Sequence, residues 1–136
     1  MNTISIPISF FNTTYDGRRH PQSGKCDGLE KGAHCQHFAY EILRYFGYKI
    51  GNLRSSDLWE DTIYTKNVRN VKPLDILFFN KDKEPYGAHV GVYLGHDRIL
   101  HLYKEVGYPT VWNFAEFKKR DKYNVFIGAK RPKMRG

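Results

Sequence analysis

One cysteine of this chain lies where its chemistry could be used. Cys35 opens the segment CQHFAYEILRYFGY, in which apolar residues recur at helical spacing. A thiolate is the reactive form of cysteine, and the unpaired N–H groups of a helix N-terminus stabilise it and could also bind an oxyanion. Cys35 is therefore a candidate nucleophile, although free cysteines also occur as small buried hydrophobic residues.

Two histidines lie in AHVGVYL and RILHLYK, which predict neighbouring strands. The turn between these strands decides whether the histidines meet, because side chains alternate along a strand. A two-residue loop at 96–97 would place His89 and His101 on opposite faces, whereas a three-residue loop at 95–97 would place them on one face as a diagonal pair. We predict the second register, because three-residue hairpins are common and Gly91 leaves room between the histidines.

Together the three side chains suggest nucleophilic catalysis. In this interpretation Cys35 is the nucleophile, His89 is its base and later protonates the leaving group, and His101 fixes the tautomer of His89. We therefore expect the pKa of Cys35 to lie well below that of a free thiol, in a way that depends on His89. The alternative is that each histidine is only a satisfied core or surface residue.

The elements that must position these residues are one or two helices followed by an antiparallel sheet, which is the α+β class. Residues 35–46 predict a helix ended by Gly47, and RSSDLWEDT predicts a second helix with Ser55 or Ser56 as N-cap. We expect the loop at 12–34 to wall a binding cleft. Four of the expected four to six strands are LDILFF, AHVGVYL, RILHLYK and YNVFIGAK.

Length and composition narrow the class of protein. The chain has 136 residues, of which 40% are hydrophobic and 15% aromatic, which predicts one packed domain over 1–136. We expect a monomer. The net charge of +8 fits a polyanion such as nucleic acid, an anionic membrane surface or a bacterial wall polymer. The basic residues are scattered except in the terminal KRPKMRG, so we expect no specific nucleic-acid site.

The sequence shows no segment apolar and long enough to predict a membrane span. The beginning, MNTISIPISFF, lacks the pattern of a secretory signal. These patterns assign no single localisation to the protein: it is either cytoplasmic or exported to the cell wall by a non-standard route. Two cysteines make no disulfide framework.

The order of these motifs resembles the NlpC-type cell-wall peptidases of the NlpC/p60 family, which are papain-like cysteine hydrolases. The family pattern is an Asp-Cys-Ser-Gly-Phe helix start, Arg-x-Ser, a Gly-Asp-Leu-x-Phe-Phe strand, a His-Val-Gly-Ile-Tyr-Leu-Gly strand and a polar third catalytic residue. The matching parts of this chain, between about residues 15 and 130, are Cys35, Arg54-Ser55-Ser56, LDILFF at 74–79, HVGVYLG at 89–95 and His101.

This resemblance implies a papain-like fold, in which the helix that carries Cys35 packs on the sheet, and a reaction without a cofactor. It implies hydrolysis of an amide through a thioester acyl-enzyme, in peptidoglycan stem peptides and typically at the bond from D-glutamate to a diamino acid. Tyr15, Ser55 and Ser56 match family positions and are candidate substrate contacts.

The helix start departs from the family pattern, since His34-Cys35-Gln36-His37 replaces Asp-Cys-Ser-Gly. In the family the acid and the serine help to hold the amino end of the peptide, so the departure leaves the substrate open. We treat His34 and Gln36 as candidate substrate contacts. The related CHAP-type amidases also vary at these positions, and an amidase of that kind acting on another amide is an alternative.

Two further alternatives concern other classes of function. The first is a non-enzymatic ligand- or wall-binding module on the same fold. The second is a zinc site made by Cys26, His34, Cys35 and His37, but their spacing fits none of the usual paired-ligand patterns, so we expect no metal. Trp59 and Trp112 are interpreted as core or rim residues, and His20 and His96 as exposed.

Overall fold

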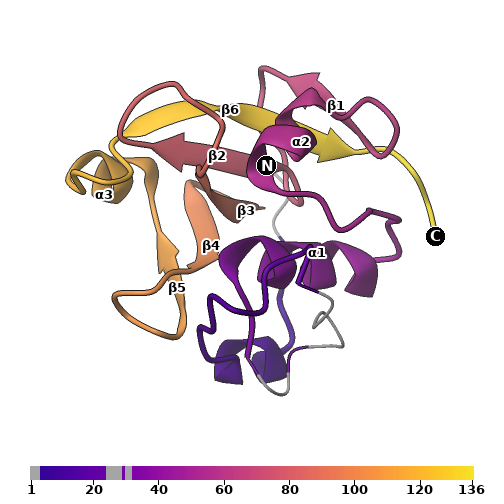
Figure 1. Cartoon of the computed structure of the whole chain (residues 1–136), viewed down its shortest axis with the longest axis horizontal. Helices are drawn as coiled ribbons and strands as arrows, with labels where there is room; N and C mark the ends of the chain where they lie inside the picture. Colours follow the sequence, from indigo (N-terminus) through magenta and orange to yellow (C-terminus); the bar gives the residue numbers. More distant parts are fainter. Residues whose placement is uncertain (1–3, 24–28, 30–31) are drawn as a thin grey trace.

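The computed structural model describes residues 4–23, 29 and 32–136 of the chain. It contains a six-stranded antiparallel sheet with the order β1-β6-β2-β3-β4-β5 (Figure 1). The α+β class and the expected number of strands are thus confirmed. The strands are β1 (Thr65–Val68), β2 (Ile76–Asn80), β3 (His89–Gly95), β4 (Arg98–Leu102), β5 (Pro109–Trp112) and β6 (Val125–Pro132). The helices are the 3-10 helix η1 (Ile8–Asn12), α1 (Cys35–Tyr45), α2 (Ser55–Glu60) and α3 (Phe114–Lys118).

The four predicted strand segments correspond to β2, β3, β4 and β6. The sequence does not predict β1 and β5, because TKNV and PTVW have only four residues each, too few for a clear alternation of side chains. Helix α3 is also not predicted, since its five residues are too few for helical periodicity. Within the part of the chain that the structure describes, no helix has the length and apolar character needed to cross a membrane.

Helix α1 begins at Cys35 and ends within one residue of the predicted position. The His34 side chain caps it by accepting a hydrogen bond from the Gln36 backbone N–H. Gly47 follows the helix with φ of +90°, a conformation that favours glycine and ends the helix as predicted. The cap by His34 at the beginning of α1 holds Cys35, and with it the sulfur, in the first turn of the helix.

Helix α2 begins at Ser55, but neither predicted serine is its N-cap. The N-cap is Arg54, whose carbonyl oxygen accepts a hydrogen bond of 2.8 Å from the backbone N–H of Leu58. Ser55 is buried inside the first turn, so the prediction was wrong by one residue. The shift makes Arg54 the last residue before the helix.

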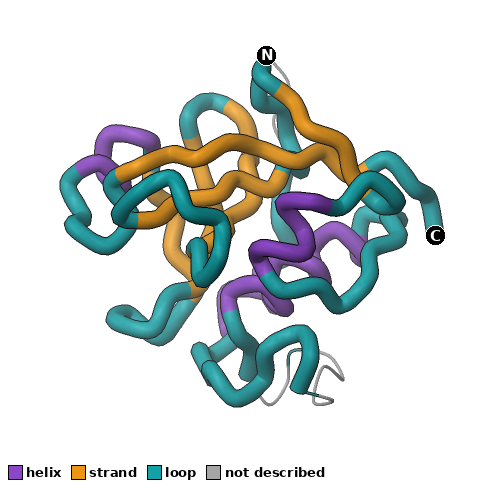
Figure 2. Tube along the Cα trace, turned by 45° about the horizontal axis from the view of Figure 1, so that its top comes forward, coloured by secondary structure: helices purple, strands orange, loops and turns teal. Residues whose placement is uncertain are grey.

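The two faces of the sheet carry two separate cores. Val90, Val92 and Leu94 of β3 belong to the core that α1 covers, whereas Tyr93 belongs to the core that contains Phe117 of α3. Helices α1 and α2 lie together on one side of the sheet, and α3 lies away from them near its other end (Figures 1 and 2). Residues at odd positions of β3 therefore lie on the face opposite the core that α1 covers, and His89, the first residue of the strand, lies where the start of β3 and the N-terminus of α1 border one cleft.

The hairpin between β3 and β4 closes with a two-residue turn. His96 and Asp97 both have positive φ, at 50° and 58°, which is the type I′ geometry that suits a twisted hairpin. The predicted three-residue loop is therefore wrong. In a regular hairpin this shorter turn would put His89 and His101 on opposite faces of the sheet.

An irregularity in β3 restores the predicted register. Gly95 pairs with Arg98 next to the turn, but Val92 pairs with Leu100, and the register shifts between these two pairs. Such a bulge adds one residue to one strand and reverses the face of everything beyond it. The two histidines consequently share a face, so the predicted register is confirmed although its cause differs.

Three of the four basic residues of the terminal segment have partners within the fold. Lys130 is buried and donates to two backbone carbonyl oxygens. Arg131 forms a two-pronged ion pair with buried Asp75, with Nε and Nη2 at 2.8 Å and 2.9 Å from the carboxylate oxygens. Arg135 packs over the ring of Tyr48. Lys130 and Arg131 thus tie β6 to neighbouring segments of the fold.

We predict that Gly91→Ala destabilises the β3–β4 hairpin. A Cβ atom at Gly91 would lie 2.7 Å from Cγ2 of Ile99 and 3.2 Å from Cβ of His101, which is closer than ordinary contact. Overpacking of this kind lowers the free energy of unfolding by about 1–3 kcal/mol, which urea denaturation would measure. A variant as stable as the parent would show that the hairpin does not need the space beside His101.

Candidate active site

The N-terminus of α1 and the beginning of β3 form a cleft of about 150 Å³. Cys35 lines it from the helix and His89 lines it from the strand. Tyr15, from the long segment before α1, forms another part of the wall, as expected for that segment. The cleft thus brings together the candidate nucleophile and the candidate base, which lie 54 positions apart in the sequence.

The Cys35 thiol is almost completely buried, with 6% of the residue exposed. Its sulfur lies 3.7 Å from Nδ1 of His34, and the backbone of Val90 approaches it from β3. Burial raises the pKa of Cys35 to about 11, although backbone hydrogen bonds at Val90 and Gln36 act in the opposite direction. The expected low pKa is therefore wrong for the free protein, because the loss of hydration outweighs the helix N-terminus.

His89 and His101 form a buried hydrogen-bonded pair. Nε2 of His89 lies 2.9 Å from Nδ1 of His101. Burial lowers the pKa of His89 to about 3 and that of His101 to about 2. Both rings are neutral at pH 7, so one nitrogen of the pair donates and the other accepts.

The surroundings of His101 decide which nitrogen donates. Nε2 of His101 is buried and has no hydrogen-bond partner among the residues that the structure describes. The ring packs against Trp112, Phe117 and Tyr103, with centroid distances of 4.3, 4.8 and 5.1 Å. An N–H group is favourable against aromatic faces, whereas a lone pair is not. We therefore assign the proton of His101 to Nε2, which makes its Nδ1 the acceptor.

This assignment fixes the tautomer of His89 as well. Its Nε2 must carry the proton that His101 accepts, so its Nδ1 has a free lone pair. A histidine with an unprotonated nitrogen in a cleft beside a thiol is equipped to act as a base.

His34 is a second imidazole near the thiol, but its Nδ1 is already used. That nitrogen accepts a hydrogen bond of 3.3 Å from the Gln36 backbone N–H and caps α1. Burial and the nearby charge of Arg54 lower the pKa of His34 to about 4. Protonation at Nδ1 would break the cap and place a second cation beside Arg54, which makes His34 a poor base.

The predicted substrate contacts divide into two groups. Tyr15, His34 and Gln36 line the cleft, whereas Ser55 and Ser56 do not. The serines belong to the first turn of α2, and the N-cap before them, Arg54, lines the cleft in their place. The side-chain oxygen of Gln36 is buried without a hydrogen-bond partner among the described residues, so it is available to an N–H group in the cleft.

Sequence reasoning missed Tyr103, Lys104 and Tyr123, which also line the cleft. Strand alternation could have found Tyr103, because it lies two positions after His101 and shares its face. Tyr123 packs 4.6 Å from the ring of His89, but it precedes β6 and no local pattern connects it to β3.

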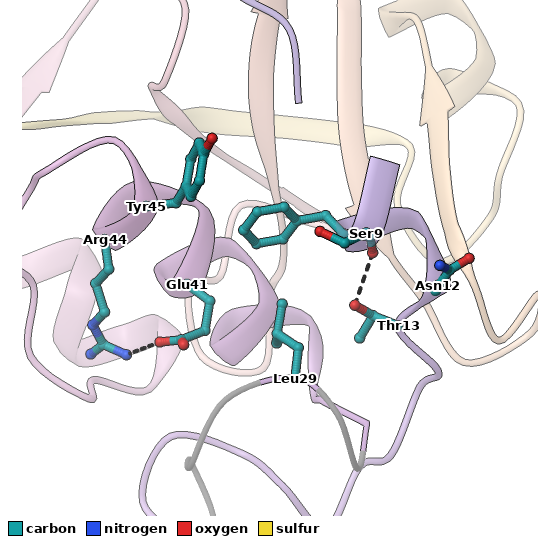
Figure 3. A pocket seen from close by; sticks show the side chains of 8 residues that line it. Ser9, Asn12, Thr13, Leu29, Glu41, Arg44 and Tyr45 are labelled. Carbon is teal, nitrogen blue, oxygen red and sulfur yellow. Dashed lines mark hydrogen bonds and ion pairs between the residues drawn. The ribbon is translucent and has the colours of Figure 1, made fainter. Parts of the chain in front are cut away.

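A larger cavity of about 750 Å³ lies beside α1 at the other end from Cys35. Figure 3 shows its side chains, including Leu29, Tyr45 and the ion pair in which Arg44 Nη1 lies 2.7 Å from the Glu41 carboxylate. None of its described lining residues is a cysteine or histidine. The cleft at Cys35 is therefore the better candidate for chemistry, despite its smaller volume.

The zinc alternative finds no support in the described residues, where no three metal-ligating side chains converge. Cys26, one of the four ligands considered, lies outside the described residues. His37 is buried in α1 and lies 3.9 Å from Glu41, whereas His34 and Cys35 line the cleft.

The fold of this chain is similar to that of two solved NlpC/p60 structures. The chain matches the NlpC/p60 domain of the peptidoglycan hydrolase SagA with a TM-score of 0.54 and 22% identity, over 81% of this chain and 85% of that one. It matches an NlpC/p60 family protein from Bacillus cereus ATCC 10987 with a TM-score of 0.52 and 18% identity, over 74% of this chain and 31% of that one. No protein-family model and no curated protein matches the chain. The predicted NlpC-type fold is confirmed, and the resemblance to this family holds at the level of the fold.

We predict that Cys35 ionises only at high pH in the free protein. With Cys26→Ser removing the other thiol, the iodoacetamide reaction rate should rise about tenfold per pH unit between roughly pH 7 and 10 without a plateau. The reason is that burial holds the pKa near 11. The Cys35→Ser variant gives the background rate. A plateau below about pH 8 would instead reveal a preformed thiolate.

We also predict acid sensitivity from the two buried histidines. Their unfolded pKa is about 6.5, whereas their folded pKa values are about 3 and 2. Protons therefore bind the unfolded chain first, and stability present above about pH 6.5 is lost as the pH falls, by up to about 1.4 kcal/mol per unit for each ring.

Urea denaturation at several pH values would measure this loss. His101→Gln keeps a neutral acceptor but does not titrate, so its stability should fall less steeply between about pH 6.5 and 4. Equal slopes for the parent and the variant would contradict a neutral buried His101.

Proposed function

We propose that this chain is a divergent NlpC/p60 cysteine hydrolase that cleaves an amide bond through a thioester acyl-enzyme. The observation that carries this proposal is that Cys35 and His89 line one cleft, while His89 is hydrogen-bonded at 2.9 Å to His101 behind it. Cys35 would be the nucleophile, His89 the general base and acid, and His101 the residue that positions His89.

In the first half-reaction Nδ1 of His89 takes the thiol proton as the sulfur attacks the carbonyl carbon of the amide. The negative charge that develops on the carbonyl oxygen would be stabilised by backbone N–H groups at the start of α1. As the carbon–nitrogen bond breaks, the leaving amine takes the proton from His89, and a thioester to Cys35 remains.

In the second half-reaction His89 takes a proton from water, and the resulting hydroxide attacks the thioester. The carbon–sulfur bond breaks, the acyl group leaves as a carboxylic acid, and the thiolate recovers its proton from His89. Hydrolysis therefore consumes one water and restores the neutral thiol and imidazole.

The burial of the groups favours proton transfer during attack over a preformed ion pair. The pKa of the thiol is raised to about 11 and that of His89 lowered to about 3, so neither is charged in the free cleft. Charge appears only as sulfur bonds to carbon, and then the imidazolium of His89 keeps its hydrogen bond to His101.

The favoured substrate is a peptidoglycan stem peptide cut between D-glutamate and a diamino acid. Support comes from the fold shared with the domain of a peptidoglycan hydrolase and from the net charge of +8, which suits an anionic wall polymer. A CHAP-like amidase acting on another amide is the second candidate, because His34 and Gln36 replace the acid and serine of the family helix start.

We predict that turnover depends on all three residues to different degrees. Incubation with a panel of muropeptides, with products read by mass spectrometry, should show cleavage at one bond. Cys35→Ser and His89→Ala should each lower the rate by about 10⁴-fold or more. His101→Leu should lower it by about 10²–10⁴-fold, and His101→Asn by less, since an amide oxygen can replace the acceptor.

The Cys26→Ser variant is the matched thiol control and should retain activity. Cleavage that survives Cys35→Ser would contradict the mechanism. No cleavage of any muropeptide, together with hydrolysis of a different amide that needs Cys35, would favour the CHAP-like alternative. Binding of wall peptides without any hydrolysis would instead indicate a non-enzymatic binding module.

A further inference from the structure

The guanidinium group of Arg54 has no partner among the residues that the structure describes. Arg54 is half-buried, it lines the cleft beside Cys35, and it makes no hydrogen bond or ion pair through its side chain with any residue that the structure describes. Two other half-buried arginines differ in this respect. Arg131 pairs with Asp75, and Arg44 pairs with Glu41. An unpaired guanidinium beside a nucleophile is suited to a ligand.

The cleft is positively charged around this group. Its described lining residues include the cations Arg54 and Lys104 but no carboxylate. Glu105, the acid next along the chain, is exposed, and its charge reaches His89 and Tyr15. It is already paired with Lys122 at 2.7 Å and accepts a hydrogen bond from Tyr123 at 3.4 Å. The charge of Arg54 also reaches His34 and Cys35: it adds to the lowering of the His34 pKa by burial and partly opposes the raising of the Cys35 pKa by burial.

We propose that Arg54 determines specificity by binding a carboxylate of the substrate close to the scissile amide, and that the cleft rejects a free ammonium group there. The claim rests on the proposed hydrolase function and adds to it the charge of the substrate. The guanidinium can form two parallel hydrogen bonds with a carboxylate, which fixes the direction of the ligand as well as its charge.

Rejection of an ammonium group follows from the same residues. An ammonium ion beside Arg54 and Lys104 would meet two like charges and no carboxylate in the described wall. The Gln36 side-chain oxygen is a neutral acceptor, which suits the N–H of an acylated amino group but does not offset the repulsion of a full positive charge. His34 offers no compensation, because its Nδ1 is occupied by the helix cap. The substrate class is thus an amide whose neighbouring residue carries a carboxylate and whose nearby amino group is acylated.

The first experiment tests the charge preference without any substrate. In the Cys26→Ser background, Cys35 is alkylated with anionic iodoacetate and with neutral iodoacetamide, and the ratio of rates is divided by the same ratio for a small free thiol. We expect this normalised ratio, iodoacetate over iodoacetamide, to be above one, which means that the cleft favours the anion. The ratio should fall about five- to tenfold in Arg54→Gln and should also fall with added salt.

Two variants control this measurement. Arg54→Lys keeps the charge and should keep most of the ratio, whereas Arg69→Gln removes an exposed arginine outside the cleft and should change nothing. A ratio that Arg54→Gln leaves unchanged would overturn the proposal. A thiol that reacts with neither reagent would also overturn it, because the cleft would then be closed to ligands of this size.

The second experiment measures binding of a labelled wall tripeptide to the inactive Cys35→Ala variant. The peptide is made with a free, an acetylated or a succinylated amino terminus, which gives a positive, neutral or negative group at that end. We expect affinity to increase in that order and the order to flatten in Cys35→Ala/Arg54→Gln. Tightest binding of the free amine would overturn the proposal.

The two experiments separate this inference from the hydrolase assignment. Loss of the iodoacetate preference in Arg54→Gln supports the anion site even where no muropeptide is cleaved. Cleavage of muropeptides with an unchanged reagent ratio would uphold the hydrolase and contradict the role of Arg54.

Discussion

The hydrogen bond between Nε2 of His89 and Nδ1 of His101 is the interaction on which the site depends. It can form only if β3 and β4 present both rings on the same face, at a distance set by the sheet. It also leaves one nitrogen of His89 free, because the aromatic surroundings of His101 favour a proton on the outer nitrogen of that ring. One contact thus links strand register, tautomer and proton transfer.

Burial keeps this arrangement uncharged until a ligand arrives. The thiol of Cys35 has a raised pKa and both imidazoles have lowered ones, all chiefly through loss of hydration. The permanent charges in the wall of the cleft are Arg54 and Lys104, and Arg54 stands outside the proton-transfer chain. The fold therefore separates two tasks: the neutral groups carry the proton, and the guanidinium offers a contact to an anionic substrate.

Much of this arrangement could be predicted from local patterns. Other parts could not be predicted, and each of these failures has a physical reason. The apolar stripe of α1 and the alternation in β3 locate Cys35 and His89, since both follow from periodicity. The register was predicted for the wrong reason: the turn has two residues, and a bulge before Gly95 supplies the extra one. Tyr123 and the aromatic cage depend on α3 and β5, which are too short to leave a periodic signal.

The first turn of α1 shows how a shared fold can accommodate a different substrate. His34 caps the helix and so holds the sulfur of Cys35 in place, and it does this as a neutral acceptor. A carboxylate at this position could cap the helix equally well, because Asp is a strong N-cap. It would, however, lie near Arg54 and offset its charge. The residue before the nucleophile can therefore change the charge of the cleft without moving the nucleophile. Substrate specificity can then evolve while the reaction stays the same.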